Sequence, residues 1–401
     1  MTLIDTILIL AGGDGDRFSP LRDKMQYRFN GVSLLRHIVG GVLSYGKQVI
    51  IVTAAHNQEA ITKDLAGTAV SFVTQAQDKG GMADAVLAAK DKLQGSALIL
   101  NANDVFDFTI IPELVDRTTE EQSSLGLVAK YIQDYFPLAY VQFAGDKAVS
   151  IVEKPGADKR PSNYGTLVVD YFPHVEEFVQ ALEHESATDD QFERAMAAMM
   201  KQTPATCVKY EGDWATIKYS WQVLSMQQYF FKKLGTKKVD PSATIHPTAV
   251  VEGNVAIGKN VKIGAFVKIA GPCFIGDNCI IGDHSLVRES TVNDRVLIGA
   301  GCEVARSYLS TGVMLHRNYV GDSVLGEQVL MGAGAVTANY RFDKKTIQTP
   351  VKGTMVDSGN TKFGLIAGTN AKIGVNATTY PGVKLAEGTV VLPGEMVTKD
   401  K

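Results

Sequence analysis

Residues 8–21 of this 401-residue chain read LILAGGDGDRFSPL, an apolar run followed by three glycines, two aspartates and one arginine. Glycine lets a backbone come very close to a ligand, and a glycine-rich turn after a strand is typical of phosphate binding through backbone N–H groups. The stretch therefore predicts an anionic ligand, and a nucleotide is the first candidate.

The first 230 residues or so alternate strand-like and helical patterns. Four segments are typical of buried strands, namely QVIIVTA, ALILNAND, SLGLVAKYI and YGTLVVDYF. Three have helical spacing of apolar residues, namely SLLRHIVGGVLSY, GMADAVLAAKDKL and QFERAMAAMM. This alternation predicts an α/β fold with a mainly parallel sheet, whose ligands bind beyond the carboxyl ends of the strands. The glycine turn lies at such an end.

From about residue 240 the apolar period becomes six. One branched residue recurs at every sixth position, at Ile245, Val251, Ile257, Ile263, Ile269, Ile275, Ile281 and Val287. The register returns at Ile373, Thr379, Leu385, Val391 and Val397. A hexapeptide period predicts a parallel β-helix with three short sides per coil, whose interior is scaffold. The interruptions at about 288–325 and 338–366 are the candidate positions for chemistry.

Composition favours an ordinary protein of two domains, which we place at residues 1–235 and 240–401. A formal net charge of −3 and the lack of a long basic run give no indication of a nucleic-acid or membrane partner. No apolar stretch reaches the ~20 residues of a membrane span, and the chain start does not resemble a signal peptide. We expect a cytoplasmic protein whose four cysteines are reduced and buried.

The stretch GGDGDRFSPLRDKMQYRFNG resembles the signature of sugar-phosphate nucleotidylyltransferases, G-G-x-G-x-R-x-x-P-L with a later lysine. The resemblance implies a Rossmann-like domain that transfers a nucleotidyl group from an NTP to a sugar-1-phosphate and releases pyrophosphate. Such a reaction needs alignment and charge neutralisation more than covalent help. By resemblance, Arg17 holds the pyrophosphate and Lys24 bridges the two substrates, while Gly12, Gly13 and Gly15 cradle phosphates.

Four further segments resemble motifs of the same family, in the same order. TQAQDKGGMADAV places Gln75 and Gly81 near the nucleobase and its sugar, and LILNAND places Asp104 as the Mg²⁺ ligand. VEKP and SNYGTLVVDYF supply the contacts to the sugar and its phosphate, namely Glu153, Lys154, Asn163 and Gly165.

Three positions in this half depart from the family pattern. Asn103 and Met82 replace the usual Gly and Thr or Leu. Thr216, in DWATIKYSW, stands where a second metal carboxylate or an Asn is usual. A hydroxyl is a poorer ligand for a hard cation than a carboxylate. We therefore expect either that Mg²⁺ depends on Asp104 and the phosphates, or that the transferase is slow.

The segment LHRNYVGDSVLGEQVLMGAGAVTANYRFD resembles the acetyltransferase domain of bifunctional glucosamine-1-phosphate acetyltransferase/N-acetylglucosamine-1-phosphate uridylyltransferases, above all the archaeal type. The resemblance implies a left-handed β-helix that commonly trimerises, with acetyl-transfer sites at subunit boundaries. Acetyl transfer from acetyl-CoA to an amine needs a base and an oxyanion site. By resemblance, His316 is the base and Tyr319, Asn339, Arg288 and Lys345 bind the substrate. Ala305, with Arg306 beside it, stands where the family has a phosphate-binding lysine.

The sequence thus predicts an enzyme that makes an NDP-sugar and pyrophosphate from an NTP and a sugar-1-phosphate, with UTP and N-acetylglucosamine-1-phosphate preferred, and that acetylates an amino-sugar phosphate. One alternative is a pyrophosphorylase for glucose or mannose phosphate whose β-helix serves assembly or regulation. Another is a non-catalytic regulatory subunit of the same architecture, against which Arg17, Lys24 and Asp104 argue together.

Overall fold

The computed structural model describes residues 3–13, 15–76 and 81–401. The chain divides into two compact units, and each is described by itself. The first contains the N-terminal strand and the loop after it, before Gly15, together with Leu34–Trp214, and the second contains Gly15–Ser33 and Ala215–Lys401. These units follow packing, whereas the expected boundary at 235–240 follows a change of sequence pattern. Segments 15–33 and 215–235 accordingly pack with the β-helix.

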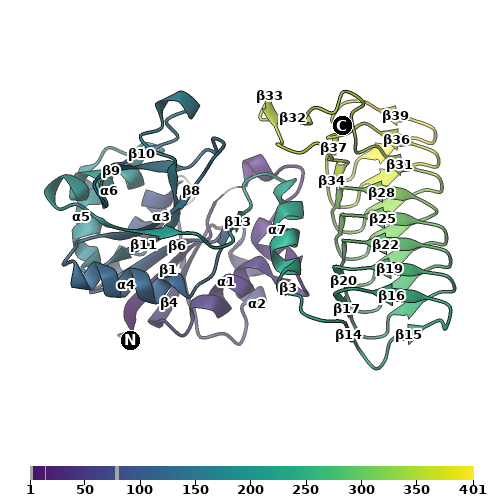
Figure 1. Ribbon diagram of the computed structural model, residues 1–401, viewed down its shortest axis with the longest axis horizontal. Helices are drawn as coiled ribbons and strands as arrows, with labels where there is room; N and C mark the ends of the chain where they lie inside the picture. Colours follow the sequence, from purple (N-terminus) through teal and green to yellow (C-terminus); the bar gives the residue numbers. More distant parts are fainter. Residues whose placement is uncertain (1–2, 14, 77–80) are drawn as a thin grey trace. The chain divides into compact units, whose positions relative to one another are not determined.

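The first unit is built on one nine-stranded sheet (Figure 1). Its main path, in spatial order, is β10 (Lys147–Glu153), β9 (Ala139–Ala144), β11 (Tyr164–Phe172), β6 (Ala97–Asn101), β1 (Ile4–Leu10), β4 (Gly46–Thr53) and β5 (Ser71–Thr74). Off this path, β8 (Gly126–Tyr131) pairs with β11 and with β12 (Thr206–Tyr210). Strands β6, β1, β4 and β5 are parallel, whereas β11 joins β6 and β8 antiparallel. All four strands and all three helices expected from the sequence are present in the α/β unit.

Both faces of this sheet are covered. Leu8 and Leu10 pack into a buried cluster with α3 (Met82–Ala88), α5 (Val175–His184) and α6 (Gln191–Gln202). Side chains alternate along a strand, so the equally buried Ile7 and Ile9 point to the opposite face. The remaining helices of the unit are α1 (Leu34–Val42), α2 (Gln58–Asp64) and α4 (Ile110–Glu120), with a 3-10 turn at Lys90–Lys92 and another at Ala157–Lys159. The carboxyl end of β1 is therefore fixed from both faces.

The second unit contains three parallel sheets of eight short strands each, stacked coil upon coil (Figure 1). The first sheet contains β14 (Lys238–Val239), β17 (Val255–Ile257), β20 (Cys273–Ile275), β23 (Thr291–Val292), β26 (Tyr308–Leu309), β29 (Val324–Leu325), β34 (Ile366–Ala367) and β37 (Lys384–Leu385). The second contains β15 (Thr244–Ile245), β18 (Lys262–Ile263), β21 (Ile280–Ile281), β24 (Leu297–Ile298), β27 (Met314–Leu315), β30 (Leu330–Met331), β35 (Lys372–Ile373) and β38 (Val390–Val391). The third contains β16 (Val250–Glu252), β19 (Lys268–Ala270), β22 (Leu286–Arg288), β25 (Glu303–Ala305), β28 (Tyr319–Gly321), β31 (Val336–Thr337), β36 (Thr378–Thr379) and β39 (Met396–Val397). This is the three-sided parallel β-helix that the hexads predict, and it is consistent with the left-handed type.

The two interruptions of the hexad pattern differ in kind. Ile257 pairs with Ile275, eighteen residues later, but Ile275 pairs with Val292 after seventeen and Leu309 with Leu325 after sixteen. The first interruption is therefore a shortening of the coils at their corners, and the three sheets run through it. The second contains an inserted antiparallel hairpin, β32 (Gln348–Val351) and β33 (Thr354–Asp357).

The rest of the second unit lies before the coils in sequence. Its elements are two 3-10 turns at Asp16–Phe18 and Lys24–Gln26, β2 (Arg28–Phe29), β3 (Val32–Ser33), β13 (Ala215–Thr216) and α7 (Gln222–Phe231). All four cysteines are free and buried, as expected from the sequence. In the described part of the chain, no helix is both long and apolar enough to cross a bilayer.

Candidate functional sites

The glycine loop after β1 is shaped around Gln75 in the first unit. A Cβ at Gly12 would lie 2.8 Å from the Gln75 Oε1 atom, so the absence of a side chain lets the glutamine lie against the loop. Gln75 is buried, and its Nε2 atom lies 3.5 Å from the carbonyl oxygen of Gly81. Gly81 has a φ of +95° and directly precedes α3. The structure thus brings together three predicted nucleotide contacts, Gly12, Gln75 and Gly81. A side chain at Gly13 would meet nothing within 4 Å, so Gly13 is open to a ligand.

Asn57 supports this loop, although the sequence analysis did not single it out. Its side-chain Nδ2 donates to the carbonyl of Ala11 at 2.9 Å, and its Oδ1 accepts from the backbone N–H of Ala54 at 2.9 Å. The buried amide therefore ties the end of β1 to the end of β4. An asparagine before a helix is commonly read as a cap, so the sequence gives no separate signal for this role.

Asp104 begins β7 (Asp104–Val105) and is almost fully buried. The indole Nε1 of Trp214 donates to its Oδ1 at 2.9 Å and fixes the carboxylate orientation. A buried, oriented carboxylate suits a hard cation such as Mg²⁺. No group of three or more His, Cys, Asp or Glu side chains suited to a metal occurs among the described residues. Asp104 therefore fits the cation as one protein ligand that needs completion by phosphate oxygens and water.

Two of the departures from the family pattern leave polar atoms unsatisfied. The Oγ1 atom of Thr216, in the second unit, is buried and has no hydrogen-bond partner among the described residues. The Oδ1 atom of Asn103, in the first unit, is also buried without a hydrogen-bond partner among the described residues. Buried polar atoms without a partner are uncommon in folded proteins, and a bound ligand or water is a usual explanation.

The predicted sugar-side residues lie at the end of β10 and the start of β11: Glu153 ends β10 and Lys154 follows it, while Asn163 directly precedes β11 and Gly165 lies within it. Lys154 pairs with Glu153 at 2.6 Å and with Asp189 at 3.2 Å. Asp189, which the sequence analysis missed, thus shares the Lys154 ammonium group. The side-chain amide of Asn163 donates to the hydroxyl of Tyr131 at 3.3 Å.

Gly165 has a packing role that needs no ligand. A Cβ at this position would lie 2.8 Å from a methyl carbon of Leu138, so the strand passes close to its neighbour. The structure thus explains this glycine without a sugar contact.

Gly15, Arg17 and Lys24 lie in the segment that groups with the second unit. Gly15 has a φ of +70°, a left-handed conformation that glycine adopts without strain, and precedes the 3-10 turn that contains Arg17. Arg17 is exposed, and Lys24 is half-buried. Asp16, between Gly15 and Arg17, pairs with Lys352 of the inserted hairpin, and this contact lowers the Asp16 pKa.

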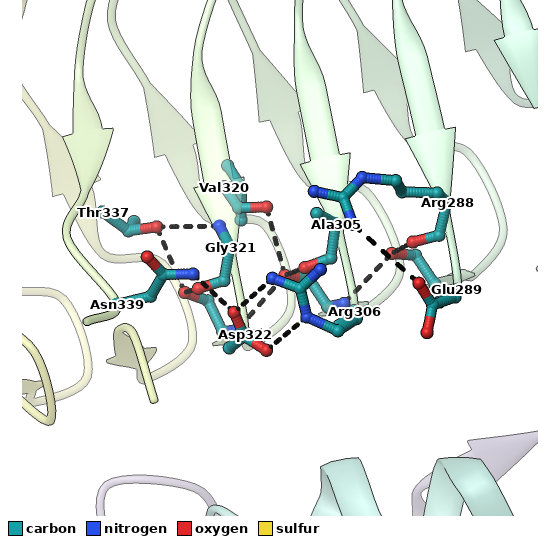
Figure 2. A network of polar contacts seen from close by, with 12 residues as sticks. Arg288, Glu289, Ala305, Arg306, Val320, Gly321, Asp322, Thr337 and Asn339 are labelled. Carbon is teal, nitrogen blue, oxygen red and sulfur yellow. Dashed lines mark hydrogen bonds and ion pairs between the residues drawn. The ribbon is translucent and has the colours of Figure 1, made fainter. Parts of the chain in front are cut away.

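A polar network joins three coils of the β-helix (Figure 2). The guanidinium of Arg306 donates two hydrogen bonds of 2.7 Å to the carboxylate of Asp322. The side-chain amide of Asn339 donates to the same carboxylate and, at 3.2 Å, to the hydroxyl of Tyr319. A Cβ at Gly321 would lie 2.6 Å from that hydroxyl, so the glycine makes room for the Tyr319 side chain. The structure therefore brings Tyr319 and Asn339 together and adds Asp322, which the sequence analysis missed.

Arg288 lies on the same face of the β-helix, in register with Ala305 and Gly321 on the following strands. Its guanidinium pairs with Glu303 at 2.9 Å. Ala305 and Gly321 carry no charge, so Arg288 is the cation among these three aligned positions. Arg306, beside it, is held by Asp322 (Figure 2).

His316 and Lys345 are exposed. His316 follows β27 at a corner, and its backbone N–H donates to Asn318 Oδ1 at 2.5 Å. Within the described residues, no hydrogen bond links its imidazole to Tyr319 or Asn339. Lys345 lies before β32, near the paired residues Arg341 and Asp343. The structure thus gathers only part of the expected acetyl-transfer set through direct contacts.

Comparison with known proteins defines the class of each half. Residues 7–158 match the model of the MobA-like NTP transferase domain, and residues 234–356 match that of the GMPPB C-terminal domain. A putative glucose-1-phosphate thymidylyltransferase from Bacillus anthracis has a similar fold, with a TM-score of 0.51 at 16% identity. That likeness covers 56% of this chain and 94% of the other. The fold and motifs therefore define an NTP transferase joined to a hexapeptide β-helix.

Relatives along the whole chain are more specific. A bifunctional sugar-1-phosphate nucleotidylyltransferase/acetyltransferase from Sulfurisphaera tokodaii is 30% identical over 409 residues, covering 98% of this chain and 97% of that protein. A bifunctional protein GlmU from Methanococcus vannielii is 28% identical over 405 residues, covering 98% and 95%. The chain belongs to the family of bifunctional sugar-1-phosphate nucleotidylyltransferase/acetyltransferases.

Proposed function

We propose that the first activity joins UTP and N-acetylglucosamine-1-phosphate to give UDP-N-acetylglucosamine and pyrophosphate. The observation that carries this proposal is the cradle of Gly12, Gln75 and Gly81, in which a buried amide faces a glycine loop at the carboxyl end of β1. A buried side-chain amide can hydrogen-bond a nucleobase edge, and a glycine loop can approach phosphate. Membership of the bifunctional family along the whole chain supports nucleotidyl transfer to a sugar-1-phosphate.

The chain's own residues align the substrates and neutralise their charge. An oxygen of the sugar-1-phosphate attacks the α-phosphorus in line, a new P–O bond forms, and the bond to the departing pyrophosphate breaks. Arg17 binds the pyrophosphate oxygens, and the Lys24 ammonium group neutralises phosphate charge on both the nucleotide and the sugar-1-phosphate. Glu153 and Lys154 orient the sugar and its phosphate. Mg²⁺ held by Asp104 supplies further neutralisation of the phosphate charge when it is bound.

A panel of NTPs against hexose-1-phosphates, with pyrophosphate release as the readout, tests the first activity. UTP with N-acetylglucosamine-1-phosphate should give the highest kcat/KM. A preference for glucose- or mannose-1-phosphate would instead identify a hexose-1-phosphate pyrophosphorylase. Absence of pyrophosphate release with every pair would favour a regulatory subunit.

The second proposed activity is acetyl transfer from acetyl-CoA to the amine of an amino-sugar-1-phosphate. Its structural support is the joined set of Tyr319, Asn339 and Asp322 on one face of the β-helix. The amine attacks the thioester carbonyl, the C–N bond forms, and CoA leaves as its thiol. His316 accepts the proton that the amine loses, since a neutral imidazole nitrogen can act as a general base. Arg288 and Lys345 bind the sugar phosphate.

Release of free CoA with glucosamine- or galactosamine-1-phosphate as acceptor tests this second activity. A rate above background with either sugar supports it. Background rates with both would leave the β-helix with an assembly role, while pyrophosphate release would remain as the test of the first activity.

We further propose that the protein assembles as a trimer through the second sheet of its β-helix. Outward-facing residues on four neighbouring strands of that sheet are apolar, namely Ile280, Leu297, Met314 and Leu330. Ile280 and Met314 are exposed and the two leucines are half-buried, and a contiguous apolar surface is typical of protein interfaces. His316 follows Met314 by two residues, so a partner on this face would lie beside the proposed base.

Light scattering should give a trimer mass for the wild type and for Met396→Lys, and a smaller mass for Met314→Lys. The cytoplasmic location remains a prediction.

A further inference from the structure

The segment that carries Arg17 and Lys24 is packed within the same compact unit as the β-helix, about 200 residues or more away in sequence. Residues 15–33 contact the coils of the β-helix through several side chains that the proposed chemistry does not use. The contacts of Tyr308, on β26, are the most extensive.

The Tyr308 hydroxyl makes two hydrogen bonds to the backbone of Arg28. The Arg28 N–H donates to the tyrosine Oη at 3.0 Å, and the Oη–H donates to the Arg28 carbonyl at 3.0 Å. The ring lies between Tyr27 and Phe29, with centroid distances of 5.5 and 5.7 Å, and Tyr308 is buried. The Tyr308 hydroxyl thus satisfies both the backbone N–H and the backbone carbonyl of Arg28, which lies four residues after Lys24.

A second contact involves the Arg28 side chain. Its Nη1 atom pairs with Asp294 Oδ2 at 2.8 Å, while its Nε and Nη2 donate to the carbonyl of Gly31 at 3.1 and 2.8 Å. Gly31 has a φ of +85°, and a Cβ there would lie 3.0 Å from the Phe274 ring. The turn that follows Lys24 therefore packs directly on the β-helix, with Gly31 against Phe274 and Arg28 paired with Asp294.

Two ion pairs lie towards the other end of the segment. Arg22 pairs with Glu387 at 3.1 Å, and Asp16 pairs with Lys352 of the inserted hairpin. Both pairs are exposed, so each stabilises the contact only slightly. Together with the contacts of Arg28, they place links to the β-helix on both sides of Arg17 and Lys24.

We propose that Tyr308 is a positioning residue for nucleotidyl transfer, and that the β-helix thereby holds the substrate-binding cations Arg17 and Lys24 in place. This inference rests on the proposed function of those two residues. Because a small displacement of a charge-neutralising group lowers the rate of an aligned phosphoryl reaction, loosening the segment should slow nucleotidyl transfer and spare acetyl transfer.

Tyr308→Phe tests the inference, since it removes both hydrogen bonds and keeps the ring. Tyr380→Phe is the matched control, because Tyr380 is also on the β-helix but half of its surface is exposed. We expect kcat/KM for the NTP to fall about 5- to 150-fold in Tyr308→Phe, the range that the loss of two ordinary hydrogen bonds gives. Acetyl transfer should stay within about twofold of wild type, and Tyr380→Phe should match wild type in both assays.

Asp294→Asn and hydrogen exchange provide the second measurement. Asparagine keeps the Oδ1 acceptor that binds the Asp277 N–H but loses the charge that pairs with Arg28. Amides of residues 24–31 should exchange faster in both variants than in wild type. Equal kcat/KM in Tyr308→Phe and Tyr380→Phe, with an active wild type, would overturn the inference. If the wild type releases no pyrophosphate, the proposed function fails, and unchanged exchange at 24–31 would then refute the anchoring as well.

Discussion

Replacing Asp170 with asparagine should stabilise the first unit more at pH 7 than at pH 5. Asp170 lies on β11 opposite Ile99 and Leu127, is 1% exposed, and has an Oδ1 atom with no hydrogen-bond partner among the described residues. Burial raises its pKa from 3.8 to about 8. The folded state therefore keeps this carboxyl protonated at neutral pH, whereas the unfolded chain releases the proton.

The sign of the effect follows from that difference. A carboxyl whose pKa is raised on folding lowers the free energy of unfolding as the pH rises from about 4 to about 8, by about 1.4 kcal/mol per pH unit. Between pH 5 and pH 7 the wild type should thus lose about 3 kcal/mol through this group. Asparagine carries no such proton, so Asp170→Asn should not lose it. The cost of burying the asparagine amide is independent of pH and cancels in the comparison.

Urea unfolding at the two pH values measures the difference. Trp214 lies in the first unit and Trp221 in the second, so a Trp221→Phe background makes fluorescence report on the first unit. Asp116→Asn, at an exposed position on α4, is the control and should follow the wild type. A stability gain from Asp170→Asn that is the same at pH 5 and pH 7 would refute the reasoning.

Three further substitutions address the proposed chemistry. Asp104→Ala should abolish Mg²⁺-dependent pyrophosphate release, because it removes the carboxylate that Trp214 orients; near-normal rates at ordinary Mg²⁺ would rule out the assignment. Thr216→Asp should lower the Mg²⁺ concentration for half-maximal rate, since a carboxylate is a better ligand than the buried hydroxyl, which has no hydrogen-bond partner in the described part of the chain. An unchanged titration would show that the position does not bind the metal. His316→Ala should reduce CoA release about 10²- to 10⁴-fold and leave pyrophosphate release near wild type; equal loss of both activities would contradict a base role.

The sequence predicts the scaffold well where one local period determines the structure. The hexads from Ile245 to Val287 identify the coils because each branched residue fills the same interior position. The pattern fails at Val292, Leu309 and Leu325, which are equally buried, because the coils there lose one or two residues at their corners. A coil with a shorter corner still packs its interior residues in the same way. A search for a fixed period of six residues does not find such a coil.

The sites are predictable where a motif carries its own spacing and less so where the contact is long-range. The family motifs place Gly12 and Gln75 at one nucleotide site, and in the structure the two residues lie against each other. The bond from Trp214 to Asp104 and the hold of Tyr308 on Arg28 join residues 110 and 280 positions apart. No local pattern marks either pair. Asp322 was likewise missed, since an aspartate at a coil corner is ordinary until its Arg306 and Asn339 partners are seen.

The buried cysteines give this chain a set of natural reporters. Burial raises the pKa of Cys207, Cys273 and Cys279 to about 12, so their thiols react with alkylating reagents only when the surrounding structure opens. Cys207 lies on β12 of the sheet, whereas Cys273, on β20, and Cys279, just before β21, lie on adjacent sides of one coil. Labelling rates at each thiol, measured by mass spectrometry under native conditions, would therefore show which unit opens first and whether two sides of one coil open together.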